Sequence, residues 1–160
     1  AGAAAEAGAA ITSAGEGGTA EGGARLCAVY AHRGQTLRLL QRDEGLDLTL
    51  ARRQWELFAL SPVAQAAGAS WAPLGLSAML NGGGAILSSA LRPGFRVVQA
   101  RVTLRATGTF VAYASPRPRA VKLDGRPVPF THDEATGLLT VPMARSATPA
   151  ELAVCFPRRA

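Results

Sequence analysis

Two histidines and a few carboxylates are the residues of this 160-residue chain whose types could support acid–base chemistry. His132 directly precedes Asp133 and Glu134, so it could act as a general base beside two carboxylates. The same three residues are typical of a polar turn between two strands, and we favour that interpretation. His32, which precedes Arg33 at the end of a predicted strand, is interpreted in the same way.

Hydrolysis or transfer of a sugar needs two carboxyl groups about 5–10 Å apart on either side of a cleft. Asp124 belongs to an Asp-Gly pair that is typical of a tight turn, and Asp43, Glu44 and Asp47 lie in a predicted loop. Nothing in the sequence pattern places two carboxylates across a pocket. We therefore predict no catalytic residue in this chain.

Motifs of other enzyme and metal sites are missing from the sequence. Ser70 lacks the second glycine of a nucleophile elbow, and no phosphate-binding Gly-Lys-Ser/Thr loop is present. Cys27 and Cys155 lie far apart in the sequence, without a second cysteine or a histidine at metal-ligand spacing. We predict two free, buried thiols, no metal site and no cofactor.

Aromatic rings could bind a sugar without catalysing its transfer. Trp55, Trp71 and Tyr113 are the rings that could stack on a sugar, but aromatic residues make up only 6% of the chain. A core with so few rings needs most of them for packing, so we favour core positions. Trp71 and Tyr113 remain the candidate substrate-binding residues.

The net charge of +6 raises the question of an acidic partner. Lys122 is the only lysine, and the arginine, alanine and glycine excess is typical of a GC-rich genome. The arginines are dispersed along the chain instead of clustered, and few rings are available to stack on bases. We therefore predict no binding to nucleic acid.

Residues 57–91 carry no charge over 35 positions, which is long enough to span a bilayer. Pro62, Pro73, Asn81 and a run of three glycines interrupt this stretch. A lipid-exposed helix could not leave so many backbone groups unsatisfied, so we predict buried strands joined by turns and no membrane span.

Composition divides the chain into a tail and one domain. Seventeen of the first 24 residues are Ala or Gly, with only Ile11 as a large apolar side chain. Such a segment buries too little surface to offset the entropy of ordering it. We predict a disordered Ala/Gly-rich tail or linker over residues 1–24 and a single domain over residues 25–160.

Apolar and polar residues alternate with period two throughout the predicted domain. In residues 96–106, Val98, Ala100, Val102 and Leu104 share one face, which is the pattern of a half-buried antiparallel strand. Residues 35–39 and 46–50 alternate in the same way. Residues 26–31 are apolar on both faces and predict a central strand, and residues 151–156 predict the last one.

Turn residues separate these strands. Asp124-Gly125 predicts a tight hairpin between residues 120–123 and 128–130, and Pro127 and Pro129 place the second of these strands at a sheet edge. A longer turn then leads into a strand over residues 138–143. The helix-like residues 64–67 are too short to change this pattern. Roughly nine or ten short strands favour a β-sandwich or barrel, and we predict an all-β, antiparallel β-sandwich of about eight to ten strands.

Five segments, taken in order, resemble the raffinose synthase/seed imbibition protein family. Ala28-Val29-Tyr30-Ala31-His32-Arg33 is similar to "VYSHR", and residues 55–63 (WELFALSPV) to "YEIFTVSPV". Residues 71–76 and 81–86 (WAPLGL and NGGGAI) are similar to "FAPIGL…NSGGAI". Residues 108–115 (GTFVAYAS) resemble "GRFGAYSS", and residues 128–139 resemble "VEFxYDExxGLL". The segments span roughly residues 26–156.

The resemblance implies galactinol-dependent galactosyltransferases and related α-galactosidases of glycoside hydrolase family 36. It also implies that this chain is the C-terminal, non-catalytic β-sandwich, because the family's catalytic aspartates lie in a preceding (β/α)8 barrel. Thr109, Val111 and Gly82 depart from the family's Arg, Gly and Ser, and the Ala/Gly tail replaces an upstream "NCQG" segment. No catalytic residue is carried over.

The expected partner is therefore the catalytic barrel of a longer parent protein, of which a chain that starts at Ala1 would be a piece. Galactosides are the small molecules that such a domain could bind, and the resemblance implies a cytoplasmic location, with the plastid as alternative. The competing interpretation is a stand-alone carbohydrate-binding or interaction module, with Trp71 and Tyr113 facing solvent in a groove.

Overall fold

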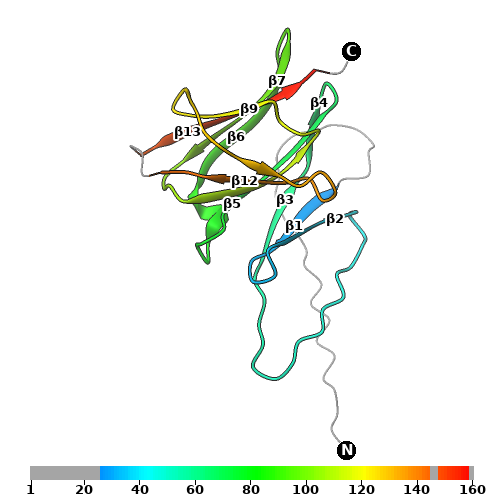
Figure 1. The fold of residues 1–160 in the computed structure, drawn as a ribbon. Helices are drawn as coiled ribbons and strands as arrows, with labels where there is room; N and C mark the ends of the chain where they lie inside the picture. The colour runs from blue at the N-terminus through cyan, green and yellow to red at the C-terminus, as the bar shows by residue number, and fades with distance from the viewer. Residues whose placement is uncertain (1–25, 145–147, 159–160) are drawn as a thin grey trace, which may run out of the picture.

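The computed structural model describes residues 26–144 and 148–158, and within them it contains strands and one short 3-10 turn but no α-helix (Figure 1). The tail predicted over residues 1–24 lies outside the described residues. The strands are β1 (Cys27–Ala31), β2 (Thr36–Leu40), β3 (Phe58–Pro62), β4 (Ala64–Ala66), β5 (Ala69–Leu76), β6 (Ile86–Pro93), β7 (Val97–Leu104), β8 (Thr109–Ser115), β9 (Ala120–Leu123), β10 (Arg126–Pro127), β11 (Thr131–His132), β12 (Leu138–Pro142) and β13 (Ala150–Pro157), with the 3-10 turn η1 (Gly82–Ala85).

Antiparallel pairing joins these strands into three sheets. The β6 sheet has the order β10-β9-β13-β7-β6, the β5 sheet the order β11-β12-β8-β5-β4, and the β1 sheet the order β2-β1-β3. The predicted all-β antiparallel sandwich is confirmed. It contains more strands than the predicted eight to ten, because very short strands such as β10 and β11 join its edges.

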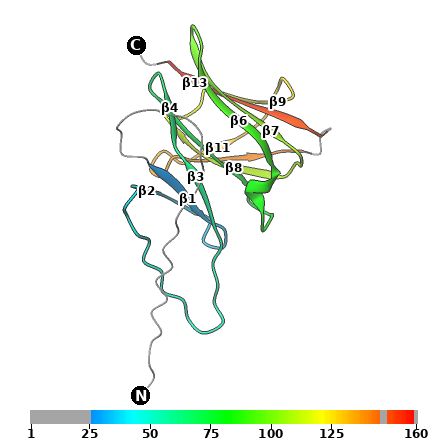
Figure 2. The ribbon, with the colours of Figure 1, turned by 180° about the vertical axis from the view of Figure 1, so that it is seen from behind.

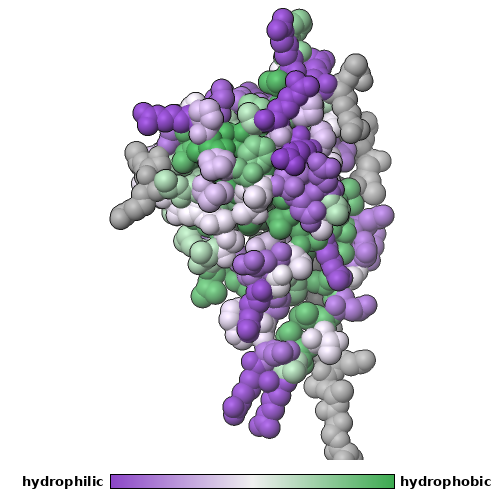
Figure 3. Space-filling model, viewed as in Figure 1, coloured by the Kyte–Doolittle hydropathy of each residue, from purple (hydrophilic) through white to green (hydrophobic). Residues whose placement is uncertain are grey.

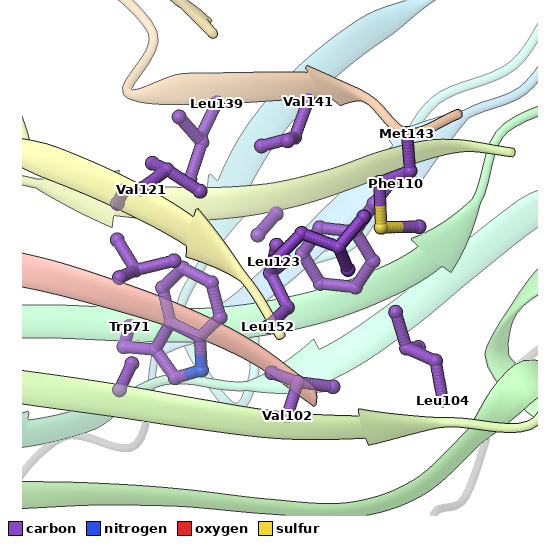
Figure 4. Close-up of a cluster of buried hydrophobic side chains, with 14 of the residues drawn as sticks. Trp71, Val102, Leu104, Phe110, Val121, Leu123, Leu139, Val141, Met143 and Leu152 are labelled. Carbon is purple, nitrogen blue, oxygen red and sulfur yellow. The ribbon is translucent and has the colours of Figure 1, made fainter. Parts of the chain in front are cut away.

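The main core lies between the β6 and β5 sheets (Figure 4). In β7, Val98, Ala100, Val102 and Leu104 are fully buried, as their alternation predicts. From the opposite sheet, Trp71 enters this core and packs between two phenylalanine rings. Its ring centroid lies 6.3 Å from that of Phe110 and 6.1 Å from that of Phe156.

The β1 sheet covers the outer face of the β5 sheet as a third layer (Figure 2). Tyr30 and Leu37 from the β1 sheet pack there against Ala72, Leu74 and Val111. The centre of the β5 sheet is therefore buried on both faces, which explains why β5 and β8 are apolar at nearly every position. The predicted central position of residues 26–31 is confirmed, since β1 lies between β2 and β3.

A bulge in β5 changes the face to which the end of this strand contributes. Trp71 pairs with Ala114 and Leu76 pairs with Phe110, but the register shifts between Pro73 and Gly75. Leu76 lies five residues after Trp71 and would face the opposite side of a regular strand. The inserted residue returns Leu76 to the main core.

Gly75 follows the bulge at a φ of +107° and lies against the backbone of Gly82. A Cβ atom on Gly75 would overlap the Gly82 carbonyl group, and one on Gly82 would overlap the carbonyl oxygen of Leu76. Two glycines therefore allow the chain around η1 to pack directly on β5.

A predicted strand over residues 46–50 is absent from the structure. Residues 46–50, predicted as a strand, lie without regular structure in a long connection between β2 and β3, and no neighbouring strand lies beside them among the described residues. The helix-like stretch over residues 64–67 forms no helix, as its short length predicts, and its residues Ala64–Ala66 form β4, which pairs with β5.

The predicted Asp124-Gly125 hairpin is confirmed, with φ values of 49° and 78° that are typical of a type I′ turn. The second strand, predicted over residues 128–130, is instead β10 at Arg126–Pro127, which forms the edge of the β6 sheet, while residues 128–130 have no regular structure. Val128 follows in irregular structure and still donates its N–H to the Val121 carbonyl oxygen.

Glu56 fastens the end of the long β2–β3 connection to the β1 sheet. Its carboxylate accepts hydrogen bonds from the backbone N–H groups of Arg33 (2.9 Å), Gly34 (3.1 Å) and Leu57 (2.8 Å). Hydrogen bonding to the charged form, led by the Arg33 N–H, holds the pKa of Glu56 below its ordinary value of 4.5.

Replacing Gly75 should be far more costly than replacing a glycine in open space. We expect Gly75→Ala to lower the free energy of unfolding by ~2–5 kcal/mol, because strain at positive φ adds to the backbone overlap. Urea unfolding of the wild type and of Gly75→Ala measures this difference in free energy. The control is Gly45→Ala, where a Cβ meets no atom within 4 Å, and we expect a change within ~0.5 kcal/mol. Equal effects of the two substitutions would show that the packing of η1 on β5 is wrong.

Glu56→Gln should make stability depend less on acid pH. A carboxylate whose pKa is lowered by folding stabilises the fold above its unfolded-state pKa, and this contribution is lost as pH falls through the folded-state pKa. We therefore expect wild type to exceed Glu56→Gln in melting temperature at pH 7, with the difference shrinking below about pH 4. Glu134→Gln, at an exposed carboxylate 3.8 Å from Arg117, is the control and should have a smaller effect at pH 7. A Glu56→Gln difference that stays constant down to pH 3 would contradict the assignment.

Candidate functional site

A hollow of about 410 Å³ lies where β3 meets β5 and the η1 turn. Its apolar walls come from Phe58, Leu60, Leu74, Leu80 and Ile86. The polar side chains that line it are those of His32, Ser61 and Asn81. These residues become neighbours only when the β1 sheet packs on the β5 sheet.

The polar groups in the hollow are engaged in local structure. The His32 Nδ1 atom lies 3.3 Å from the Ser77 carbonyl oxygen, and its ring packs edge-on against Tyr30 at 5.3 Å between centroids. The Asn81 side chain accepts a hydrogen bond from the Gly84 N–H at 3.2 Å and so caps η1. One imidazole, one hydroxyl group and one amide, without a carboxylate among them, do not form an acid–base pair for glycosyl transfer.

The rim of the hollow is apolar and exposed. Leu80 is 78% exposed, Leu60 46% and Met79, next to Leu80, 41%. Figure 3 shows hydrophobic side chains gathered over the η1 loop, at the lower left of the body of the molecule. The hollow is thus bordered by three exposed apolar side chains, those of Leu60, Met79 and Leu80.

His132, Asp133 and Glu134 form the turn that the sequence favours. The His132 Nε2 atom hydrogen-bonds the Ala114 carbonyl oxygen at 2.9 Å, while its buried Nδ1 has no hydrogen-bond partner among the described residues. Asp133 accepts hydrogen bonds from the Thr136 hydroxyl (2.7 Å) and the Ala135 N–H (3.0 Å), which lower its pKa. Asp133 thus stabilises the turn between β11 and β12, whereas His132 contacts β8 and Glu134 lies 3.8 Å from Arg117 at the surface.

The structure does not bring Trp71 and Tyr113 together. Trp71 belongs to the main core, is 1% exposed and donates its Nε1–H to the hydroxyl of Ser89, an exposed residue of β6, at 3.3 Å. Tyr113 packs against the other core, on the opposite face of the β5 sheet, and Gly137 leaves room for its ring. Because Trp71 is buried, it presents no ring face to a sugar, as the core interpretation of this residue predicts.

Trp55 has a half-exposed ring, unlike Trp71. It is 53% exposed, and the Arg33 guanidinium group lies 4.9 Å from the centre of its ring. The cation contacts this aromatic ring at the base of the β2–β3 connection.

Cys27 and Cys155 are free thiols, as predicted, but each is only partly buried. Burial raises the pKa of the Cys27 thiol. Within the described ranges, no cluster of three or more His, Cys, Asp or Glu residues could hold a metal ion, and no helix is long and apolar enough to cross a membrane.

The hollow escaped sequence reasoning because its lining residues are distant in the chain and mostly apolar. The signal that could have pointed to it is the run from Asn81 to Gly84, whose glycines indicate close backbone packing. That run predicts a tight contact with another strand, but it does not identify β5 as the partner.

Curated relatives of this chain are plant galactosyltransferases. A galactinol–sucrose galactosyltransferase of Oryza sativa subsp. japonica is 36% identical over 132 residues, which cover 79% of this chain and 17% of the relative. A probable galactinol–sucrose galactosyltransferase 1 of Arabidopsis thaliana is 36% identical over 70% of this chain and 15% of its own length. A stachyose synthase of Pisum sativum is 29% identical over 64% of this chain and 12% of its own. The chain thus spans about a sixth of the length of the first two relatives.

A family model confirms the resemblance seen in the five segments. The model of the family "raffinose synthase or seed imbibition protein Sip1" matches residues 8–143, so the match starts within the segment predicted as a tail and runs through β12. Because this match covers most of the chain, the chain belongs to the raffinose synthase or seed imbibition protein family.

Proposed function

We propose that this chain is the non-catalytic C-terminal β-sandwich of a raffinose-synthase-like galactosyltransferase or α-galactosidase, acting in raffinose-family oligosaccharide metabolism. In this proposal it supports a catalytic (β/α)8 barrel that belongs to the same longer protein. Relatives named as galactinol–sucrose galactosyltransferases are about six times longer than the part matched by this chain, which leaves room for such a barrel.

The observation that carries this proposal is that carboxylates of the domain serve its turns and surface. Glu56 binds three backbone N–H groups, and Glu44 accepts a hydrogen bond from the Gln41 N–H. Asp124 accepts one from the Glu151 N–H at 2.8 Å, and Asp133 caps its own turn. None of these acids lines the hollow, so the two carboxyl groups that glycosyl transfer requires are better sought in the rest of the protein.

The two sides of the domain differ in a way that suits a supporting role. The outer face of the β6 sheet carries exposed polar groups such as Arg101, Lys122 and Glu151, and Arg101 lies 3.4 Å from Glu151. The hollow on the other side exposes Leu60 and Leu80. We infer that the polar face stays in water and that the barrel covers the hollow, because burying exposed leucines is favourable.

A stand-alone carbohydrate-binding module is the alternative function. The structure offers it little support, since Trp71 is buried and an arginine contacts the ring of Trp55. Galactosides would then have to bind without Trp71, at a Trp55 ring that already contacts the Arg33 guanidinium group.

Transferase activity separates these proposals. We expect the purified chain to form no raffinose from galactinol and sucrose, because no carboxylate of the described residues lines the hollow. We also expect the rice relative to lose activity when its matched segment is deleted, and to regain it when this chain replaces that segment. Raffinose formation that follows the purified chain through size-exclusion chromatography would contradict a non-catalytic role. Saturable heat in calorimetry of the isolated chain with raffinose or galactinol would favour the carbohydrate-binding module instead.

A further inference from the structure

The long connection between β2 and β3, residues 41–57, which we call the arm, has a strand sequence without a strand partner. Leu46, Leu48 and Leu50 alternate with Asp47 and Thr49, which is the pattern of a half-buried strand. Figures 1 and 2 show the arm extending from the β1 sheet, away from both five-stranded sheets. The sequence of the arm therefore predicts a strand, but the structure pairs no strand with it among the described residues.

Reciprocal hydrogen bonds shape both ends of the strand-like segment. At one end, Gln41 donates its N–H to the Glu44 carboxylate at 3.0 Å, and Glu44 donates its N–H to the Gln41 carbonyl oxygen at 3.1 Å. At the other end, Ala51 and Gln54 exchange two hydrogen bonds of 2.9 Å in the same way. The hydrogen bonds of Glu56 hold the end of the arm against the β1 sheet. The arm therefore has a defined conformation, in which residues 45–50 lie between two hydrogen-bonded turns.

The segment between these turns offers what a strand partner needs. Leu48 is 50% exposed and Leu50 45%. Among the described residues, no backbone hydrogen bond joins residues 45–50 to another segment. Unpaired backbone groups beside a row of leucines are the features by which an extended segment adds to the edge of another sheet.

We propose that the arm pairs as a β-strand with the catalytic part of the same longer polypeptide. This inference rests on the function proposed above and names the contact through which the domain would be joined to the rest of the protein. The arm lies inside the range that the family model matches, residues 8–143, and the relatives are about six times longer than the part matched by this chain. The exposed residues of the arm are therefore available to be covered by a remainder of that size.

A second copy of this chain fits the arm less well. Two arms pairing with each other would bury a strand of about six residues from each chain, whereas stable interfaces bury at least roughly 1,200 Å². Charge does not select a partner either, because the arm carries three arginines and four acidic residues, a net charge of only −1. Backbone pairing and burial of leucines remain as the forces that would hold it.

Hydrogen–deuterium exchange of residues 45–50 tests the proposal. The two samples are the isolated chain and a chimera in which this chain replaces the matched segment of the rice galactosyltransferase. We expect rapid exchange in the isolated chain and at least tenfold slower exchange in the chimera. In the chimera, Leu48→Ser/Leu50→Ser should abolish the protection, whereas Leu87→Ser, at a leucine of similar exposure (49%) on β6, should preserve it.

The outcomes distinguish this inference from the function on which it rests. A chimera with transferase activity but an unprotected arm would overturn the inference and leave the supporting role intact. Protection of residues 45–50 in the isolated chain would also overturn the inference. If the protection rises with protein concentration, the partner is a second copy of the chain. If it does not, the partner is another segment of the same chain. Should the chimera fail to fold, the intact rice enzyme decides, since an unprotected segment at the aligned position would overturn the inference.

Discussion

The β5 sheet has to bury both of its faces, and most other features of the domain follow from this constraint. One face carries Trp71 and Phe110 into the main core, and the other carries Ala72 and Val111 against the β1 sheet. A sheet without a central water-facing surface offers no place there for a pair of carboxylates or for an open aromatic platform. The bulge before Gly75 places Leu76 in the main core, on the same face as Trp71.

Sequence reasoning recovered the parts of this fold that depend on local pattern. The alternation of β7 and the Asp124-Gly125 turn are properties of neighbouring residues, so they could be identified without knowing the rest of the chain. The third layer could not be predicted, because an apolar pattern on both faces of a strand does not identify the element that covers each face. The hollow escaped for the same reason: His32 and Asn81 are brought to it by the packing of sheets, not by their neighbours in sequence.

In the arm, the sequence pattern predicts a strand that the structure does not form. Its leucines alternate as in β7, yet this structure gives them neither a ladder nor a core. In the proposed function both observations have one cause, since a domain that supports a larger protein has to expose the residues with which it holds that protein. The exposed leucines around the hollow and the leucines of the arm would then belong to one continuous role.

Whether the β5 sheet is a middle layer is tested most directly by placing a charge between the β5 and β1 sheets and measuring the free energy of unfolding. Val111 is 2% exposed and faces the β1 sheet, whereas Lys122 is exposed on the outer face of the β6 sheet. We expect Val111→Asp to lower the free energy of unfolding by ~3–5 kcal/mol, because the carboxylate would be buried without a partner, and Lys122→Asp to cost less than ~1 kcal/mol. Equal, small effects of both substitutions would mean that water reaches this face and that the three-layer account is wrong.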